Sequence, residues 1–468
     1  MSGEFTISGT TLRQRTAEAI GDERLHGSLE RAVTRFADNR AGAFALLDDP
    51  DALRTAARRI RSEILADLPR IVGLFADQAM SNGAHIHWAL DAEDANRYVV
   101  QVAKRIGART VVKGKSMVTE EIHLNKALQA EGFEVIETDL GEWIIQLAGQ
   151  TPSHIIAPAV HLDRHQVRDI LQPEAPEGVV LDSEPERLAG FARERLREVF
   201  LRADLGVTGC NFAVAESGSV VLIENEGNGR LSSSAPRVHI AVMGTERIVE
   251  NFSQLGLFLD LLARSGTGQH LSVYTNVITG PRRPADLDGP EEVHIVIVDN
   301  GRSELLGTEF SEALNCIRCG ACLNVCPVYR QVGGHAYGWV YSGPIGAVLT
   351  PLLAIEHPEA GELANASTLC GACMDACPVQ IPLQDLLLGL RRRKAAEAAK
   401  AEKGAWRAWA QAWGRPVTYR ASLKAMATGR HLSRLVTRAP GLRHWSQGRA
   451  ALTPAAKSFT ERWQAGEL

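Results

Sequence analysis

Residues 316–327 read CIRCGACLNVCP and residues 370–378 read CGACMDACP, so seven of the chain's eight cysteines fall in two short runs. The first run has the spacing C-x2-C-x2-C-x3-C-P. That spacing wraps three thiolates around one iron-sulfur cluster and sends the fourth thiolate to a neighbouring cluster. The two runs therefore predict a protein that holds two iron-sulfur clusters and transfers electrons.

Aligning the two runs on the Cys-Pro pair that ends each of them indicates which cysteines correspond. The corresponding residues are Cys319 and Cys370, Cys322 and Cys373, Cys326 and Cys377, and finally Cys316 and Ser367. Crossed ligation then gives the first cluster Cys316, Cys319, Cys322 and Cys377, and the second cluster Cys326, Cys370 and Cys373. The second cluster is one cysteine short.

Three explanations of this deficit remain open. The second cluster could be a three-iron cluster, a four-iron cluster with Ser367 or water on the odd iron, or a cluster whose last ligand comes from elsewhere in the chain. A hydroxyl oxygen is a harder ligand than a thiolate and suits iron in such a cluster less well. We therefore expect the second cluster to be labile or unusual.

Other uses of cysteine fit the pattern poorly. Zinc sites require four ligands in a closed tetrahedron, whereas here seven cysteines gather and each run ends in proline, at Pro327 and Pro378. Disulfides require an oxidising compartment. Cys210 lies alone in the apolar stretch LGVTGCNFAV, so we interpret it as a small buried hydrophobic residue and leave it out of the site.

Composition predicts a soluble, multidomain protein with an uneven charge distribution. The 468 residues suffice for two or three domains, and 45% hydrophobic and 23% charged residues are ordinary values. Residues 391–468 carry 17 Lys and Arg against 4 Asp and Glu, whereas the rest of the chain carries 34 against 51. No apolar leader opens the sequence, and the apolar run at 345–355 is too short to span a bilayer. We expect a cytoplasmic protein with at most peripheral membrane contact.

Hydrophobic periodicity divides the part of the chain before the cysteines into two regions. Residues 1–75 read as a helical arm, in which Asp49 caps a helix that begins at Pro50. Residues 76–300 alternate strands with helices, which predicts an α/β domain with a mostly parallel sheet. The predicted strands lie at 110–112, 134–136, 154–157, 220–223, 238–242 and 294–298. Thr245 is expected to cap a helix that carries Ile248 and Phe252 on one face.

Two local sequences in the α/β region contain candidate binding residues. VVKGKSMVTEE is not a phosphate loop, because Arg109 stands where that loop requires its first glycine, but Lys113 and Lys115 could still meet an anion. AESGSVVLIENEGNGR places Glu216, Glu224 and Glu226 beside a short strand pair. We assign these carboxylates only as weak pocket candidates, because turns and solvated strand edges also account for them.

Residues 301–395 are expected to form a helical domain that presents the cysteines from helix ends and turns, with a helical hairpin inserted between the runs. Residues 396–468 form a basic, Trp-rich region in which Trp406, Trp409 and Trp413 repeat at helical spacing. This stripe could pack on the cluster domain, on a partner subunit or on anionic lipid. A nucleic-acid partner is not expected, because no recognised binding module is present.

The sequence closely resembles the lactate utilization protein B family. The matching segments are GVTGCNFAVAESGSVVLIENEGN, CIRCGACLNVCPVY, LCGACMDACPVQIPL and the region from Trp406 to Trp463. The resemblance implies an α/β domain like that of sugar-phosphate isomerases and CoA transferases, followed by an all-α helical ferredoxin domain with two clusters, expected to be of the 4Fe-4S type. It implies the same seven cysteine ligands, and also three cysteines for the second cluster.

The resemblance also implies a function. We expect a non-catalytic electron-transfer subunit of a complex that oxidises L-lactate to pyruvate and supports growth on lactate. Its partners would be the other subunits of that complex and an electron acceptor such as the respiratory chain. The catalytic residues remain unknown, and the sequence contains no Rossmann glycine fingerprint for a nicotinamide or flavin. The alternative is that the α/β domain is itself catalytic or ligand-binding, with structural or redox-sensing clusters.

Overall fold

The computed structural model describes residues 10–354, 357–397, 400–432 and 454–467. The chain forms two compact units, Met1–Arg392 and Arg393–Leu468. The first unit contains the sheets and both cysteine runs, and the second contains the Trp-rich region.

Four helices open the described part of the first unit: α1 (Leu12–Ile20), α2 (Glu23–Ala45), α3 (Pro50–Ala66) and α4 (Leu68–Ser81). The predicted cap is confirmed, because the Asp49 side chain accepts the N–H of Ala52 at 2.9 Å. Arg61 of α3 is buried and donates to the carbonyl oxygens of Ile248 and Leu314. These bonds tie α3 to segments far along the chain.

A six-stranded, fully parallel sheet forms the centre of the α/β part, in the order β1-β10-β7-β4-β2-β3. Its strands are β1 (His85–Ala89), β2 (Thr110–Lys113), β3 (Glu134–Glu137), β4 (Leu205–Thr208), β7 (Val238–Gly244) and β10 (Glu292–Val298). The inner strands are buried on both faces, which is why they read as continuous apolar runs. The parallel sheet and the four strands predicted in it are confirmed.

A second, four-stranded sheet has the order β8-β5-β6-β9. Its strands are β5 (Phe212–Val214), β6 (Ser219–Glu224), β8 (Ile248–Val249) and β9 (Tyr274–Ile278). Strands β5 and β6 pair antiparallel through a tight turn, which confirms the short strand pair expected there.

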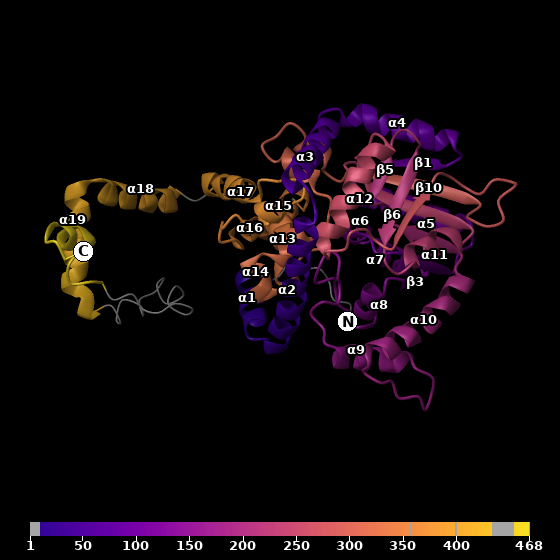
Figure 1. Ribbon diagram of the computed structural model, residues 1–468, viewed down its shortest axis with the longest axis horizontal. Coiled ribbons are helices and arrows are strands. Elements are labelled where there is room, and N and C mark those ends of the chain that lie inside the picture. Colours follow the sequence, from indigo (N-terminus) through magenta and orange to yellow (C-terminus); the bar gives the residue numbers. More distant parts are fainter. Residues whose placement is uncertain (1–9, 355–356, 398–399, 433–453, 468) are drawn as a thin grey trace. The chain divides into compact units, whose positions relative to one another are not determined.

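The helices of the α/β part are α5 (Ala92–Arg105), α6 (Met117–Glu121), α7 (Leu124–Ala130), α8 (Leu140–Leu147), α9 (Arg164–Leu171), the short η1 (Gln172–Glu174), α10 (Pro185–Arg202), α11 (Asn228–Ser234) and α12 (Phe252–Gly266). Helix α5 contacts β1 and β10, α8 contacts β3, and α12 contacts β5 and β8 (Figure 1). This layering buries the apolar faces of both sheets.

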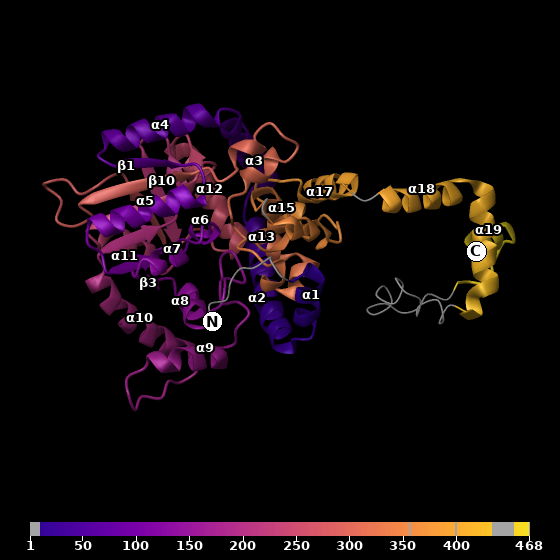
Figure 2. The same ribbon diagram turned by 180° about the vertical axis from the view of Figure 1, so that it is seen from behind.

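The cysteine-rich part contains only helices and turns among its described residues. Its elements are η2 (Ser303–Leu305), η3 (Ser311–Asn315), α13 (Ala321–Asn324), α14 (Pro327–Val332), η4 (His335–Tyr337), α15 (Gly343–Leu353), η5 (Pro358–Asn365), α16 (Ala372–Ala376) and α17 (Leu383–Glu397). Helix α15 contacts η5, so the insertion between the runs is helical as predicted. Helix α2 lies beside α13 and α14 (Figure 1), and its position next to α13 is also seen from behind (Figure 2).

One continuous hydrophobic core joins the amino-terminal helices, the second sheet and the cysteine-rich part. Phe75, Val221, Phe258, Leu323 and Tyr337 are fully buried members of this core. A separate core lies between the parallel sheet and helices such as α5 and α7. The cysteine-rich part is therefore packed on the α/β part rather than attached by a linker.

Two sequence-based elements are wrong. Residues 154–157 form no strand, because this segment is buried against the cysteine-rich part, where the Ser153 carbonyl accepts the Tyr329 hydroxyl at 2.7 Å. Thr245 caps no helix. The β-branched Ile248 and Val249 pair with β5 instead, and α12 begins only at Phe252. Strands β1, β4, β8 and β9 were missed.

The second unit contains α18 (Lys400–Gly414), α19 (Pro416–Thr428), η6 (Gly429–Leu432) and α21 (Phe459–Gln464). The predicted aromatic stripe is confirmed on α18, where the Trp406 and Trp409 ring centroids lie 5.8 Å apart and those of Trp409 and Trp413 lie 5.5 Å apart. Trp445 lies outside the described residues.

Candidate iron-sulfur site

The two cysteine runs adopt the same backbone conformation at corresponding positions. Arg318 and Leu369 both have positive φ, at 60° and 56°, and they precede Cys319 and Cys370. The glycines that follow these cysteines, Gly320 and Gly371, have φ of 77° and 86° and are the N-cap residues of helices α13 and α16. These two helices contact each other. The runs are thus two copies of one loop-helix element that face each other.

Electrostatic effects between the thiols separate the cysteines into two groups. Burial, followed by the Cys377 thiol and then Cys316, raises the pKa of Cys319. Burial, followed by Cys316 and Cys319, raises the pKa of Cys322 well above its ordinary value. Cys377, from the second run, is therefore a neighbour of the first three cysteines of the first run.

The second group contains the remaining three cysteines. Burial, followed by the thiols of Cys326 and Cys370, raises the pKa of Cys373 to about 12. Cys326 therefore lies among cysteines of the second run. The two groups adjoin, because Cys373 also raises the pKa of Cys322.

The donor set fits iron-sulfur clusters. Seven soft sulfur ligands gather in two adjoining groups, and all but Cys316 and Cys370 are buried. Backbone N–H groups point at three of the sulfur atoms: Arg318 donates to Cys316 Sγ at 3.4 Å, Tyr329 to Cys326 Sγ at 3.5 Å and Ile381 to Cys377 Sγ at 3.4 Å. Such bonds are among the features that tune bound clusters.

Arginines from other elements hold the cysteine loops in place. Arg54 of α3 donates to the Cys377 and Asp375 carbonyl oxygens at 3.0 and 2.8 Å. Arg247, which follows β7, donates to the Cys316 carbonyl oxygen at 3.0 Å. These hydrogen bonds satisfy backbone oxygens of the cysteine loops, so the arginines stabilise loops that short helices alone could not.

Ser367 lies where the missing cysteine was expected. A small hollow is lined by Ser367 together with Cys326, Cys370 and Cys373. The Ser367 hydroxyl accepts the N–H of Leu369 at 3.1 Å. Among the described residues of this hollow, no other cysteine takes part.

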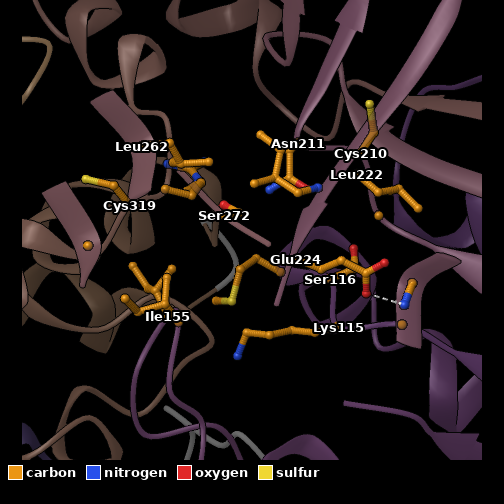
Figure 3. A pocket seen from close by; sticks show the side chains of 18 of the residues that line it. Lys115, Ser116, Ile155, Cys210, Asn211, Leu222, Glu224, Leu262, Ser272 and Cys319 are labelled. Carbon is orange, nitrogen blue, oxygen red and sulfur yellow. Dashed lines mark hydrogen bonds between the residues drawn. The ribbon is translucent and has the colours of Figure 1, made fainter. Parts of the chain in front are cut away.

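A larger cavity of about 310 Å³ lies between the sheets and the first cysteine run. Figure 3 shows Cys319 and Leu262 on one side of it and Leu222, Glu224 and Cys210 on the other. The Cys319 thiol turns away from the cavity, so the cavity meets the backbone of the cysteine loop. Desolvation raises the pKa of the Cys210 thiol, which lies across the cavity from Cys319, to about 12.

The cavity opens at the carboxyl ends of β2 and β4. After β2 the chain continues to β3 on one side, and after β4 it continues, by way of the second sheet, to β7 on the other side. The connections therefore diverge between these neighbouring strands. In open α/β sheets such a divergence creates the crevice in which ligands bind. The cavity is lined there by Lys115 and Ser116 after β2 and by Gly209 and Asn211 after β4.

Only some of the lysines and glutamates that the sequence suggested as pocket residues line the cavity. Lys115, Glu224 and Glu226 line the cavity. Lys113 does not, because it is buried in ion pairs with Glu120 and Glu137 at 2.9 and 2.8 Å. Glu216 is also elsewhere, and its carboxylate accepts the N–H of Phe252 at the start of α12.

A buried ion-pair network that the sequence did not reveal joins the cavity to the cysteine loop. Glu246 contacts Arg302 at 2.7 Å and Arg318 at 3.3 Å, and Arg302 contacts Glu121 at 2.8 Å. Burial alone would raise the pKa of Glu246, but Arg302 and Arg318 lower it to about 2. Arg318 was visible as the charged residue inside the first cysteine run, but its partners lie too far along the chain to be predicted.

Fold and site together define an iron-sulfur protein in which a parallel α/β domain precedes two interleaved cysteine runs. Sequence models of three families match the chain: the LUD domain at residues 72–298, the 4Fe-4S dicluster domain at 312–381 and the carboxyl-terminal region of lactate utilisation protein B at 389–467. The chain belongs to the lactate utilization protein B family.

Individual relatives cover nearly the whole chain. Lactate utilization protein B of Shouchella clausii is 45% identical over 98% of this chain and 98% of its own length. The protein of the same name from Bacillus subtilis is 44% identical over 97% and 96%. The uncharacterized electron transport protein YkgF of Escherichia coli is 46% identical over 90% and 88%. The chain is therefore a lactate-utilisation iron-sulfur protein.

A search of solved structures matches a DUF162 family protein from Deinococcus radiodurans, with 16% identity and a TM-score of 0.29 over 49% of this chain and 98% of that one. In the part of the chain that the structure describes, no helix is both long and apolar enough to cross a membrane.

Proposed function

We propose that this chain is the electron-transfer subunit of a cytoplasmic complex that oxidises L-lactate to pyruvate. Its partners are the other subunits of that complex and a downstream acceptor such as the respiratory chain. The observation that carries the proposal is the exchange between the cysteine runs, in which Cys377 lies with the first group and Cys326 with the second. Two sites built in this way must lie close together, as electron transfer requires.

The seven cysteines would hold two clusters, with Cys316, Cys319, Cys322 and Cys377 at one and Cys326, Cys370 and Cys373 at the other. When bound, such clusters supply the acceptance and release of single electrons. The chain's own residues position the thiolates, and the surrounding apolar core excludes water from the buried sulfur atoms. Cys370 is exposed, so the second site is the one that reaches solvent or a partner.

The test uses full-length protein purified without oxygen. Iron and acid-labile sulfide are quantified, and electron paramagnetic resonance is recorded with and without L-lactate and the partner proteins. We expect two clusters, and we expect Cys319→Ser to abolish lactate-driven reduction. Cys210→Ser is the matched control and should leave cluster content unchanged. Colourless protein without sulfide, or lactate turnover that persists in the complex when the clusters are absent, would overturn the proposal.

A second candidate function places ligand binding, or catalysis, in the α/β domain. The cavity at the carboxyl ends of β2 and β4 favours it, as does the likeness to sugar-phosphate isomerases and CoA transferases inferred from the family. A fold hosts many functions, so this likeness alone carries little weight. Lactate turnover by protein in which the cysteines are replaced would support this candidate.

A further inference from the structure

The cavity beside the first cysteine run has the size of a small-molecule site. Its volume of about 310 Å³ lies at the lower end of the ~300–1,000 Å³ usual for ligand pockets, which favours a small metabolite over a dinucleotide. Both apolar side chains, such as Ile155 and Leu262, and polar groups, such as Ser116 and Asn211, line it. This mixture is typical of sites that orient a small polar ligand.

The cationic side chains that line the cavity differ in how fully they are paired with other groups. Lys115 Nζ contacts Glu142 at 2.8 Å, and Arg302 lies between two carboxylates. Arg247 donates to the carbonyl oxygens of Asn211 and Cys316. Each of these cations already has strong partners.

Arg318 is less fully paired. Its side chain is only 10% exposed, and its single ion pair among the described residues, to Glu246, is 3.3 Å long. Its Nη1 atom is buried and has no hydrogen-bond partner among the described residues. The guanidinium lies over the Tyr341 ring, 4.6 Å from the centroid. A buried guanidinium nitrogen without an acceptor is costly, so an acceptor supplied by a ligand would be strongly favoured.

We propose that this cavity binds a small monocarboxylate of the 2-hydroxy or 2-oxo acid class, with Arg318 receiving the carboxylate. The inference rests on the proposed function, because it assigns a site for the acid that the complex oxidises, or for its product. Lys115, which follows β2, contributes further positive charge, and the polar side chains after β2 and β4 face the hydroxyl or keto oxygen.

Charge balance separates a monocarboxylate from a phosphate ester. The cavity is lined by four cations, Lys115, Arg247, Arg302 and Arg318, and by four carboxylates, Asp139, Glu224, Glu226 and Glu246. One anionic group can use the incompletely paired Arg318, whereas a dianion would face four carboxylates without a second free cation. Charge-assisted hydrogen bonds to a guanidinium are roughly twice as strong as neutral ones, which suffices to select the ligand's orientation.

The proposed carboxylate site lies directly beside the first cysteine group. Arg318 directly precedes Cys319, and its backbone N–H donates to Cys316 Sγ at 3.4 Å. A carboxylate bound to Arg318 and an electron gained by a cluster at these cysteines would therefore both place negative charge beside the same guanidinium. Coupling between two sites is reciprocal, so the bound carboxylate should make the first cluster harder to reduce, and reduction should weaken carboxylate binding.

The test measures ligand binding by calorimetry to the full-length, cluster-loaded protein without oxygen. The probes are L-lactate, pyruvate and inorganic phosphate, and the variants are Arg318→Gln, Arg318→Lys and Lys115→Gln. Lys104→Gln is the matched control, because Lys104 is a cation of α5 outside the cavity that pairs with Glu131. We expect saturable binding of the two carboxylates, weakened about tenfold or more by Arg318→Gln and unchanged by Lys104→Gln.

Failure of this inference is distinguishable from failure of the proposed function. Absence of saturable lactate and pyruvate binding to protein that contains both clusters would overturn the carboxylate site and leave the electron-transfer proposal intact. Tighter binding of phosphate than of either carboxylate would overturn it as well. If Arg318→Gln loses its clusters, Lys115→Gln decides, and unchanged affinity in a cluster-loaded Lys115→Gln protein would count against the site. A shift of one cluster potential to a more negative value on pyruvate addition would support it.

Discussion

The guanidinium of Arg318 lies 3.3 Å from the carboxylate of Glu246, which follows the central strand β7. This ion pair connects a loop inside the first cysteine run to the carboxyl edge of the parallel sheet. Because Glu246 also pairs with Arg302 at 2.7 Å, the position of the cysteine loop depends on the sheet that carries the cavity. The cysteine-rich part and the α/β part thus act as one structural body.

Each cysteine run contributes one cysteine to the group formed mainly by the other run. This arrangement predicts which cluster a given cysteine substitution alters. Cys377→Ser should alter the spectrum of the first cluster although Cys377 belongs to the second run, and Cys326→Ser should alter the second cluster although Cys326 belongs to the first run. Electron paramagnetic resonance of the reduced proteins checks this, with Cys210→Ser as control. Loss of the second cluster alone in Cys377→Ser would contradict the grouping.

Ser367 lines the hollow that contains Cys326, Cys370 and Cys373, so Ser367→Cys should supply a fourth thiolate. We expect the second cluster to hold four irons more firmly and to be lost more slowly in air, because a thiolate suits iron better than a hydroxyl. Iron content followed during exposure to air measures this. Ser367→Ala is the control and should not slow the loss of iron. If Ser367→Cys loses iron as fast as the unsubstituted protein does, the fourth ligand comes from elsewhere.

Gly320 and Gly371 form a matched pair of test positions. Both have positive φ, so alanine at either should cost about 1–2 kcal/mol in backbone strain. A Cβ at Gly320 would in addition lie 3.0 Å from Cε1 of the buried His154, whereas at Gly371 no atom lies within 4 Å. Gly320→Ala should therefore lower the anaerobic unfolding midpoint more than Gly371→Ala. Equal unfolding midpoints would show that the His154 side chain can move aside with no loss of stability.

Removal of Arg302 should strongly destabilise the protein. Arg302 is buried between Glu121 and Glu246, and without it two buried carboxylates lose their main partner. We expect Arg302→Met to lower the free energy of unfolding by about 3–5 kcal/mol. Arg237→Met, which removes an exposed pair with Glu291, should lower the free energy of unfolding far less, because solvent screens that pair. Chemical denaturation of both variants tests the difference, and similar losses would refute a structural role of the buried network.

Buried histidines predict loss of stability in mild acid. Burial lowers the pKa of His154 and His294 to about 4 and that of His239 to about 3. Between these values and the unfolded pKa of about 6.5, the unfolded chain binds more protons than the folded chain, so stability falls as pH falls. The loss should approach about 1 kcal/mol per histidine per pH unit.

Unfolding midpoints between pH 5.5 and 7.5 measure this dependence. His239→Gln should flatten it by roughly one sixth, on the basis that the six histidines whose pKa burial lowers contribute alike; the other three are His123, His161 and His335. The exposed His270 provides the control, because His270→Gln should leave the dependence unchanged. A pH dependence that His239→Gln does not alter would mean that other groups set it.

Much of the fold followed from local patterns in the sequence. The central strands of the parallel sheet were predictable because burial on both faces makes them continuous apolar runs, as in β7 and β10. The predicted strand at 154–157 was wrong for a related reason, since an apolar segment buried in a loop looks the same. Strand β1 was missed because its alternating His85, Ile86 and His87 read as polar.

The sequence by itself determined the two cysteine runs, their spacing and the deficit at Ser367, because ligand spacing is a local property of the chain. Only the tertiary structure decided that Arg318, Glu246 and Arg302 meet, and that a cavity at the ends of β2 and β4 lies against the Cys319 loop. Such contacts join residues far apart along the chain. They arise from how the sheet and the cysteine loops bury one shared core, which no local pattern encodes.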